Sequence, residues 1–231
     1  AGAQAPVGAC VDRRCLAPGP CPNLEVEEGG YLEILRALRA LPGVKKVFIR
    51  SGIRFDYLML DPDESFFREL VEFHVSGQLK VAPEHVSDKV LALMGKPGRA
   101  SYDAFARRFA ELNRELGLKQ YLVPYFISAH PGAGLEEAVE LAESLRDSGF
   151  VPDQVQDFYP TPGSLSTAMY WTGLDPLSGN PVHVARGARE RAMQRALLQY
   201  KKPENRELVR EALLLAGRRD LVGPGPKCLV R

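Results

Sequence analysis

The stretch QYLVPYFISAHPG, residues 120–132, is the most apolar strand-like run of the chain and decides how the rest is interpreted. Its aromatic and β-branched residues favour a strand. The run then ends in a serine, a histidine and a Pro-Gly turn. A helical pattern that begins with acidic residues follows at 135–149. We therefore predict a buried strand that leads through a polar loop into a helix.

Three further runs repeat this pattern, each bounded by turn residues and separated from the next by helical periodicity. The predicted strands lie near residues 44–50, 78–82, 120–127 and 153–159. The predicted helices lie at 31–41, 61–75, 87–94, 101–117, 135–149, 185–200 and 204–217. Strands that alternate with helices indicate a parallel sheet with right-handed crossovers. Four strands are too few for an eight-stranded barrel, so we expect an α/β fold with an open sheet or an arc of a barrel, followed by C-terminal helices.

The composition is that of a globular domain and points to no charged partner. The chain has 231 residues, of which 45% are hydrophobic and 26% charged, and this suffices for a sizeable core. Its 30 basic and 29 acidic side chains nearly cancel, so the net charge gives no argument for nucleic acid or for a membrane. The first residues lack the pattern of a signal peptide, and a cytoplasmic location is the expectation.

Polar, charged or conformationally restricted residues follow all four predicted strands. The first strand is followed by residues 50–54, the second by 83–85, the third by 128–132 and the fourth by 159–163. Each group taken singly is explained by surface or turn chemistry. Because the carboxyl ends of parallel strands meet at one edge of a sheet, the four groups together predict a ligand site there.

Four longer stretches carry a family resemblance. They read KVFIRSGIRFD (46–56), LKVAPEHVSDKVLALMGKPG (79–98), YLVPYFISAHPG (121–132) and DQVQDFYPTPGSLSTAMYWTG (153–173). In this order they resemble the later segments of radical SAM enzymes, most closely the YgiQ-type branch. The resemblance implies a partial (β/α) barrel of the radical SAM type, with S-adenosyl-L-methionine and a [4Fe-4S] cluster as cofactors. In that superfamily the cluster cleaves S-adenosylmethionine reductively to a 5′-deoxyadenosyl radical.

One departure from the family pattern changes what this chain is expected to do alone. The family binds its cluster through a C-x3-C-x2-C loop after the first strand, and this sequence contains no such motif. The four predicted strands correspond to strands three to six of the barrel. We therefore interpret the chain as the C-terminal portion of a longer protein, with the missing N-terminal part as its partner. The resemblance implies a Cys/Pro-rich irregular segment at 1–29, the second half of the barrel at 30–180 and a helical extension at 181–231.

The resemblance also implies which residues contact the cofactor, while the catalytic residues remain unknown. The implied cofactor-binding positions are Arg54, Glu84, Ser128, His130, Gly132 and Gln156. Arg54 offers a fixed fork of donors that matches a carboxylate. Gly132 is expected to let the backbone approach the cofactor closely. By the same resemblance, His130 and Tyr159 are expected to face the substrate.

Three cysteines close together form a separate candidate site. Cys10, Cys15 and Cys21 follow a C-x4-C-x5-C spacing, and Cys228 stands near the other end of the chain. Thiolates at such density predict ligands of an auxiliary cluster or of zinc, with Cys228 a conceivable fourth ligand. The spacing matches no common zinc-finger pattern. The alternative is reduced thiols that pack as small hydrophobic side chains.

Two functions from different classes follow. The first is a part of a radical SAM enzyme that, without the cluster loop, is inactive alone and whose substrate is unknown. The second is a non-catalytic α/β binding domain that carries an auxiliary metal or cluster site. The basic helix predicted at 185–200, which runs on to two lysines, is explained as a solvated face or, less readily, as a nucleic-acid contact, since interleaved aromatic residues are scarce.

Overall fold

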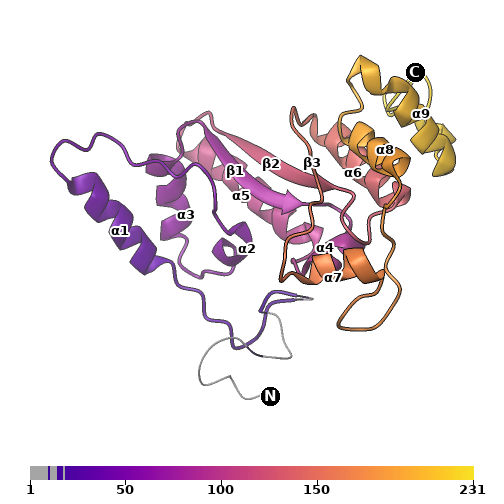
Figure 1. The fold of residues 1–231 in the computed structure, drawn as a ribbon. Coiled ribbons are helices and arrows are strands. Elements are labelled where there is room, and N and C mark those ends of the chain that lie inside the picture. The colour runs from indigo at the N-terminus through magenta and orange to yellow at the C-terminus, as the bar shows by residue number, and fades with distance from the viewer. Residues whose placement is uncertain (1–9, 11–14, 18) are drawn as a thin grey trace. The chain divides into compact units, whose positions relative to one another are not determined.

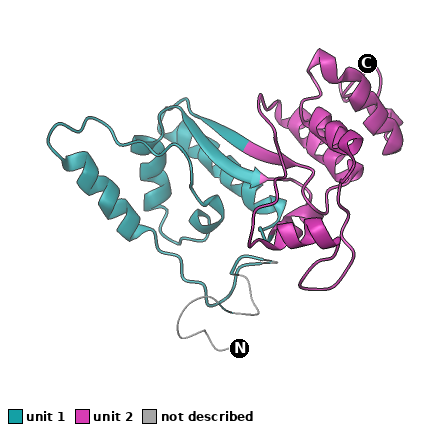
Figure 2. Ribbon diagram, viewed as in Figure 1, with its two compact units in different colours: residues 1–83, 95–124 teal, residues 84–94, 125–231 magenta. Residues whose placement is uncertain are grey.

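The computed structural model describes residues 10, 15–17 and 19–231 and has a mixed α/β fold (Figure 1). The chain divides into two compact units (Figure 2). Unit 1 comprises residues 1–83 and 95–124, and unit 2 comprises residues 84–94 and 125–231. In the part of the chain that the structure describes, no helix is both long and apolar enough to cross a membrane.

Unit 1 consists mainly of helices and contains most of the first strand of the sheet. Its elements are α1 (Gly29–Ala40), α2 (Phe55–Leu58), α3 (Ser65–Glu69), the π-helical turn η1 (Leu70–His74), most of β1 (Gln78–Glu84) and α5 (Arg99–Glu115). One helix was expected at 61–75, but the structure widens into the π-helical turn after Glu69. The turn buries Leu70 and Val71 and places the His74 ring 2.8 Å from the Val47 carbonyl oxygen.

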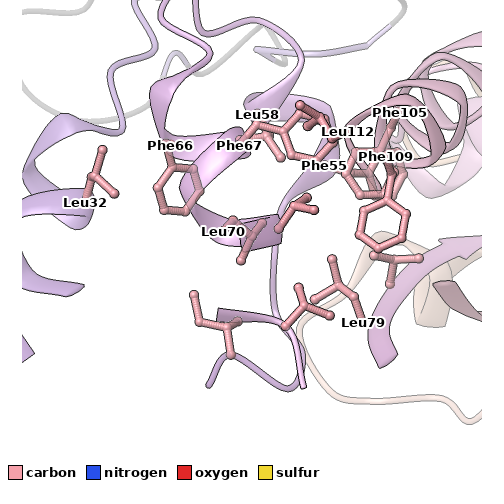
Figure 3. Packing of buried hydrophobic residues seen from close by; sticks show 14 of the residues in the cluster. Leu32, Phe55, Leu58, Phe66, Phe67, Leu70, Leu79, Phe105, Phe109 and Leu112 are labelled. Atoms are coloured by element: carbon pink, nitrogen blue, oxygen red, sulfur yellow. The ribbon is translucent and has the colours of Figure 1, made fainter. Parts of the chain in front are cut away.

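Aromatic side chains fill the core of unit 1, as Figure 3 shows. The Phe105 ring is fully buried and stacks on Phe67, with ring centroids 5.2 Å apart and planes 9° apart. Phe55 and Phe109 flank it at 5.5 and 6.2 Å. These residues come from α2, α3 and α5, so one aromatic cluster holds three helices together.

Unit 2 carries the remaining helices. Its elements are α4 (Asp88–Met94), the second half of β2 (Tyr121–Ser128), α6 (Leu135–Ser148), β3 (Gln156–Asp157), α7 (Leu165–Thr172), α8 (Ala188–Leu198), the 3₁₀ turn η2 (Pro203–Asn205), α9 (Arg206–Leu215) and the 3₁₀ turn η3 (Arg219–Leu221). Helices α6, α8 and α9 share one core, in which Ala142, Leu197 and Leu213 are fully buried. Burial of a leucine side chain stabilises the fold by roughly 1.5 to 3 kcal/mol.

The sheet has three strands in the order β1-β2-β3. Strands β2 and β3 are parallel, with Ile127 opposite Gln156 and Ser128 opposite Asp157. The α/β class and the predicted strands at 78–82 and 120–127 are confirmed. The fourth predicted strand is reduced to two residues at its predicted centre.

The predicted strand at 44–50 was wrong, because the described structure has no strand there. The segment lies beside other backbone through two separate hydrogen bonds. The Ile49 amide donates to the His74 carbonyl oxygen at 2.8 Å, and the Lys80 amide donates to the Arg50 carbonyl oxygen at 3.3 Å. Two bonds to different partners form no continuous ladder, so the apolar residues of this segment pack without making a strand.

Candidate functional site at the strand ends of unit 2

Two strand ends turn through the same unusual backbone conformation. Glu84 ends β1 with a φ of 66°, and Ala129 follows β2 with a φ of 57°. Residues other than glycine rarely adopt this left-handed region, which costs about 1 to 3 kcal/mol, and such residues cluster at ligand sites. In each case the next residue is a buried histidine, His85 or His130.

His130 is held by both of its ring nitrogens. Nδ1 lies 2.7 Å from the carbonyl oxygen of Pro131, and Nε2 lies 2.9 Å from Oγ of Ser166 on α7. A carbonyl oxygen only accepts, so Nδ1 carries the proton and the Ser166 hydroxyl donates to Nε2. The ring also meets Phe158 edge to face, with centroids 5.0 Å apart. Burial lowers the pKa of His130 to about 4, so the ring is uncharged near neutral pH.

His85 is the second buried histidine of this region. The amide of Ser87 donates to its Nδ1 at 3.0 Å, so in the neutral ring the proton sits on Nε2. Burial, and then the nearby His130, lower the pKa of His85 to about 4, against a smaller opposing effect of Glu137. Two imidazoles therefore stay neutral at adjacent strand ends and act as hydrogen-bonding groups rather than as charges.

Glu137 lies at the start of α6 and receives two hydrogen bonds. The Gly134 amide donates to Oε2 at 2.8 Å, and Lys89 Nζ donates to Oε1 at 2.6 Å. Burial alone would raise the pKa of Glu137, but these hydrogen bonds outweigh it and lower the pKa below its usual value. The carboxylate thereby joins α6 to α4.

A charged network joins β2, β3 and α8. Ser128 Oγ donates to Asp157 Oδ1 at 2.5 Å. Arg195 contacts the same carboxylate through Nε at 2.9 Å and through Nη2 at 2.7 Å. This two-point contact fixes the guanidinium in one plane. The Ser128 hydroxyl therefore donates to Asp157 and helps to position its carboxylate.

Gln194 braces the loop that follows β2. Its side chain is buried, accepts from the Ala129 amide at 3.0 Å and donates to the Ala133 carbonyl oxygen at 2.8 Å. One side-chain amide thus satisfies both ends of a five-residue turn. Gln194 was not among the residues predicted from the sequence. A glutamine among the inward-facing residues of a helix is a signal for such a role, because a buried amide requires partners.

An open cavity of about 710 Å³ lies next to this network. Gln156, Asp157 and Tyr159 line it from the β3 segment, and Arg195 and Lys202 line it from α8 and the residues after it. The Tyr159 side chain is 75% exposed. The cavity combines an aromatic ring, an amide and cations, and this combination suits a polar ligand with a planar part.

The structure brings five of the six predicted cofactor-binding residues into unit 2, whereas Arg54 belongs to unit 1. Arg54 pairs with Asp56 at 2.6 Å and covers the Tyr57 ring. Of the five, Gln156 lines the cavity described above. Ser128 and His130 are buried and hydrogen-bonded within the protein. Their side chains therefore stabilise the end of β2.

Gly132 makes the close approach that the sequence predicted, but the neighbour is a side chain of the protein. Its φ is +94°, and a Cβ at this position would overlap Cδ1 of Leu93. The backbone is therefore near α4 rather than open to a ligand at this point. The space that glycine leaves is filled by leucine.

Replacing Gly132 with alanine is expected to lower the free energy of unfolding of unit 2 by about 1 to 3 kcal/mol, because alanine is strained at this φ and its Cβ would also overlap Cδ1 of Leu93. Gly149→Ala is the matched control, since Gly149 has a φ of +71° and no atom near the added Cβ. Urea denaturation should show a larger loss for Gly132→Ala than for Gly149→Ala. Adding Leu93→Ala should remove that difference, and equal losses in the two single variants would contradict the role of Leu93.

The cysteine trio lies in unit 1, and its metal or cluster binding stays a prediction. Cys10, Cys15 and Cys21 have free thiols, and the Cys21 amide donates to the Cys15 carbonyl oxygen at 2.7 Å. Among the described residues, no three His, Cys, Asp or Glu side chains lie close enough together to hold a metal ion.

The fold defines an α/β protein with a parallel sheet and a polar site at its strand ends, and comparison with known proteins adds its relatives. Residues 153–231 match the family model described as "Domain of unknown function (DUF3362)". The chain is 59% identical over 228 residues to a UPF0313 protein of Clostridium perfringens strain 13, covering 99% of this chain and 34% of the relative. It is 54% identical over 223 residues to a UPF0313 protein of Clostridium botulinum strain 657, covering 96% and 35%. The chain thus spans about a third of the length of these relatives.

Proposed function

We propose that the chain is one part of a longer radical SAM-type protein and that the strand ends of unit 2 form a wall of its cofactor site. The motifs quoted above and the parallel strands support the proposal. The observation that carries it is the cavity beside β3, where Gln156 and Tyr159 meet an arginine that Asp157 holds in place. The whole protein is proposed to cleave S-adenosylmethionine reductively.

The iron–sulfur cluster of such an enzyme does not fit the residues of this chain. The C-x3-C-x2-C motif is absent from the sequence, and the described residues contain no cluster of metal-ligating side chains. Since the relatives are about three times as long, the proposal places the cluster ligands in the remaining part of the protein. It assigns this chain binding and positioning only.

The residues that face the cavity have chemistry suited to that role. The Gln156 amide is exposed and provides both a donor and an acceptor for a polar ligand edge. The Tyr159 ring offers a planar surface on which an aromatic base can stack. On the cavity itself, the Asp157 carboxylate holds the Arg195 guanidinium at two points, so this part of the wall is ordered before a ligand arrives.

The test uses the whole relative from Clostridium perfringens strain 13, whose sequence is expected to contain C-x3-C-x2-C outside the matched third. After anaerobic reconstitution with iron and sulfide and reduction with dithionite, it should convert S-adenosylmethionine to 5′-deoxyadenosine and methionine. Replacing the cysteines of that motif should abolish both products. A reduced, cluster-loaded protein that forms no 5′-deoxyadenosine would favour the alternative, a non-catalytic α/β binding domain.

The role of the wall is tested by Gln156→Ala in the present chain. Loss of the amide should weaken the binding of S-adenosylmethionine about tenfold in calorimetry, about the size of one hydrogen bond. Asn180→Ala is the control, since it removes an exposed amide of unit 2 that does not line the cavity. Equal affinity of the Gln156 variant and the control would reject the assignment.

A further inference from the structure

The final segment of unit 2 lines a second open cavity, which shares only Lys202 with the cavity beside β3. It has a volume of about 710 Å³ and lies between residues 200–206, at the end of α8, and the C-terminal residues 223–231. Pockets of this size hold small organic molecules. Lys202 lines both this cavity and the one beside β3.

Four cationic side chains line the second cavity, and no carboxylate side chain does. They are Lys201, Lys202, Arg206 and Arg231. Within the described part of the chain, none of the four forms a salt bridge. The Lys201 ammonium instead lies 5.8 Å from the centre of the Tyr200 ring. Cationic side chains gathered around one hollow attract an anion that carries several negative charges.

Several other arginines of unit 2 are paired with carboxylates. Arg189 pairs with Glu211, and Arg195 pairs with Asp157 at 2.7 Å. Arg218 contacts Glu143 at 2.7 Å. Two of the three arginines of helix α8, Arg189 and Arg195, are therefore paired with carboxylates, which argues against an extended nucleic-acid surface along it. Among the described residues, Arg191, Arg219 and Lys227 also form no salt bridge, but they do not line the cavity.

The rest of the lining is apolar and tightly turned. Residues 223–226 form a Gly-Pro-Gly-Pro turn, and the side chains of Leu229 and Val230 are buried. The turn closes around the Cys228 thiol, whose Sγ lies 3.4 Å from the point that a Cβ on Gly225 would occupy. Prolines and aliphatic side chains give an apolar wall next to the cations, where the uncharged portion of a ligand can pack.

We propose that this cavity binds a small molecule that carries a diphosphate group. Lysine and arginine donors recognise phosphate oxygens through charge-assisted hydrogen bonds. Four cations match the several negative charges of a diphosphate, and the apolar wall accepts the group to which it is attached. The site does not depend on the proposed function, because its residues take no part in the cavity beside β3 except Lys202.

Inorganic pyrophosphate is the probe for calorimetry on the present chain at low ionic strength. We expect saturable binding of one pyrophosphate per chain, weakened by added salt. Lys202→Gln and Arg206→Gln should each weaken binding about tenfold, since each removes a charged donor. Lys227→Gln is the matched control, because Lys227 lies in the same turn but does not line the cavity, and it should change the affinity less than twofold.

A second measurement, the rate of cysteine alkylation, tests whether pyrophosphate binds in this cavity. Pyrophosphate should slow the alkylation of Cys228 by N-ethylmaleimide, while the exposed Cys15 reacts at an unchanged rate, as peptide mass spectrometry will show. No saturable binding at millimolar pyrophosphate, or equal losses for the Lys202, Arg206 and Lys227 variants, would overturn the proposal. So would tighter binding of a ten-residue oligouridylate that all three variants weaken alike, since that outcome indicates a general nucleic-acid surface.

Discussion

Lowering the pH from 7 to 4 is expected to remove roughly 6 kcal/mol from the free energy of unfolding of unit 2, about 3 kcal/mol for each of two buried histidines. The pKa of His130 is lowered to about 4 by burial, and that of His85 to about 4 by burial and by His130. In the unfolded chain both pKa values return to about 6.5. Between these values the unfolded state binds more protons than the folded state. Stability is therefore complete above pH 6.5 and is lost as the pH falls toward 4.

Urea denaturation at pH 7, 6, 5 and 4, at constant ionic strength, measures this loss, with hydrogen exchange of α6 and α8 as the reporter of unit 2. The slope above pH 5 isolates the histidines, because the pKa of the neighbouring Glu137 is lowered and its carboxylate titrates below that range. His130→Gln removes one titrating ring and should reduce the slope by about half. Equal free energies of unfolding at pH 7 and pH 5 would show that the two rings are not held neutral.

Phe105→Ala is expected to destabilise unit 1 by about 3 to 5 kcal/mol, the largest effect of any single substitution considered. The Phe105 ring is fully buried at the centre of the aromatic cluster, so its removal leaves a cavity between α5, α3 and α2 (Figure 3). Because the side chains of a protein core are closely packed, the surrounding helices should move too little to fill the cavity completely.

Two further variants make the measurement specific to the cluster. Phe105→Leu retains much of the volume and should cost about 1 to 1.5 kcal/mol. Phe48→Ala removes the same side chain from a position that is 44% exposed and should cost less than Phe105→Leu. A loss below about 1 kcal/mol for Phe105→Ala, measured by urea denaturation, would contradict the central position of this ring.

The fold class was predictable because hydrophobic periodicity is local, whereas the extent of the sheet depends on partners far away in sequence. The strands at 78–82 and 120–127 were predicted close to their observed bounds. The segment 44–50 has the composition of a strand but forms only scattered backbone hydrogen bonds. Helix α7 was missed, because its sequence LSTAMYWT lacks charged residues and follows a Pro-Gly turn that indicates a loop.

The position of the candidate site could be predicted, but the roles of its residues could not. Parallel topology predicts polar groups at one edge of the sheet, and Gln156 and Tyr159 are found in a cavity there. No sequence pattern indicates that both His130 nitrogens are bonded within the protein or that Leu93 fills the space at Gly132. Such roles depend on contacts that α4 and α7 make with the strand ends. Sequence spacing does not predict contacts between residues so far apart in the chain.

The course of the chain between its two units limits how the protein can be divided in the laboratory. It crosses between them at residues 83/84, 94/95 and 124/125, and the first and last of these crossings fall inside β1 and β2. Neither unit is thus one uninterrupted piece of polypeptide. A truncation at either strand crossing cuts a hydrogen-bonded strand and exposes a sheet edge that invites aggregation. Protein engineers should therefore move or label the two units together.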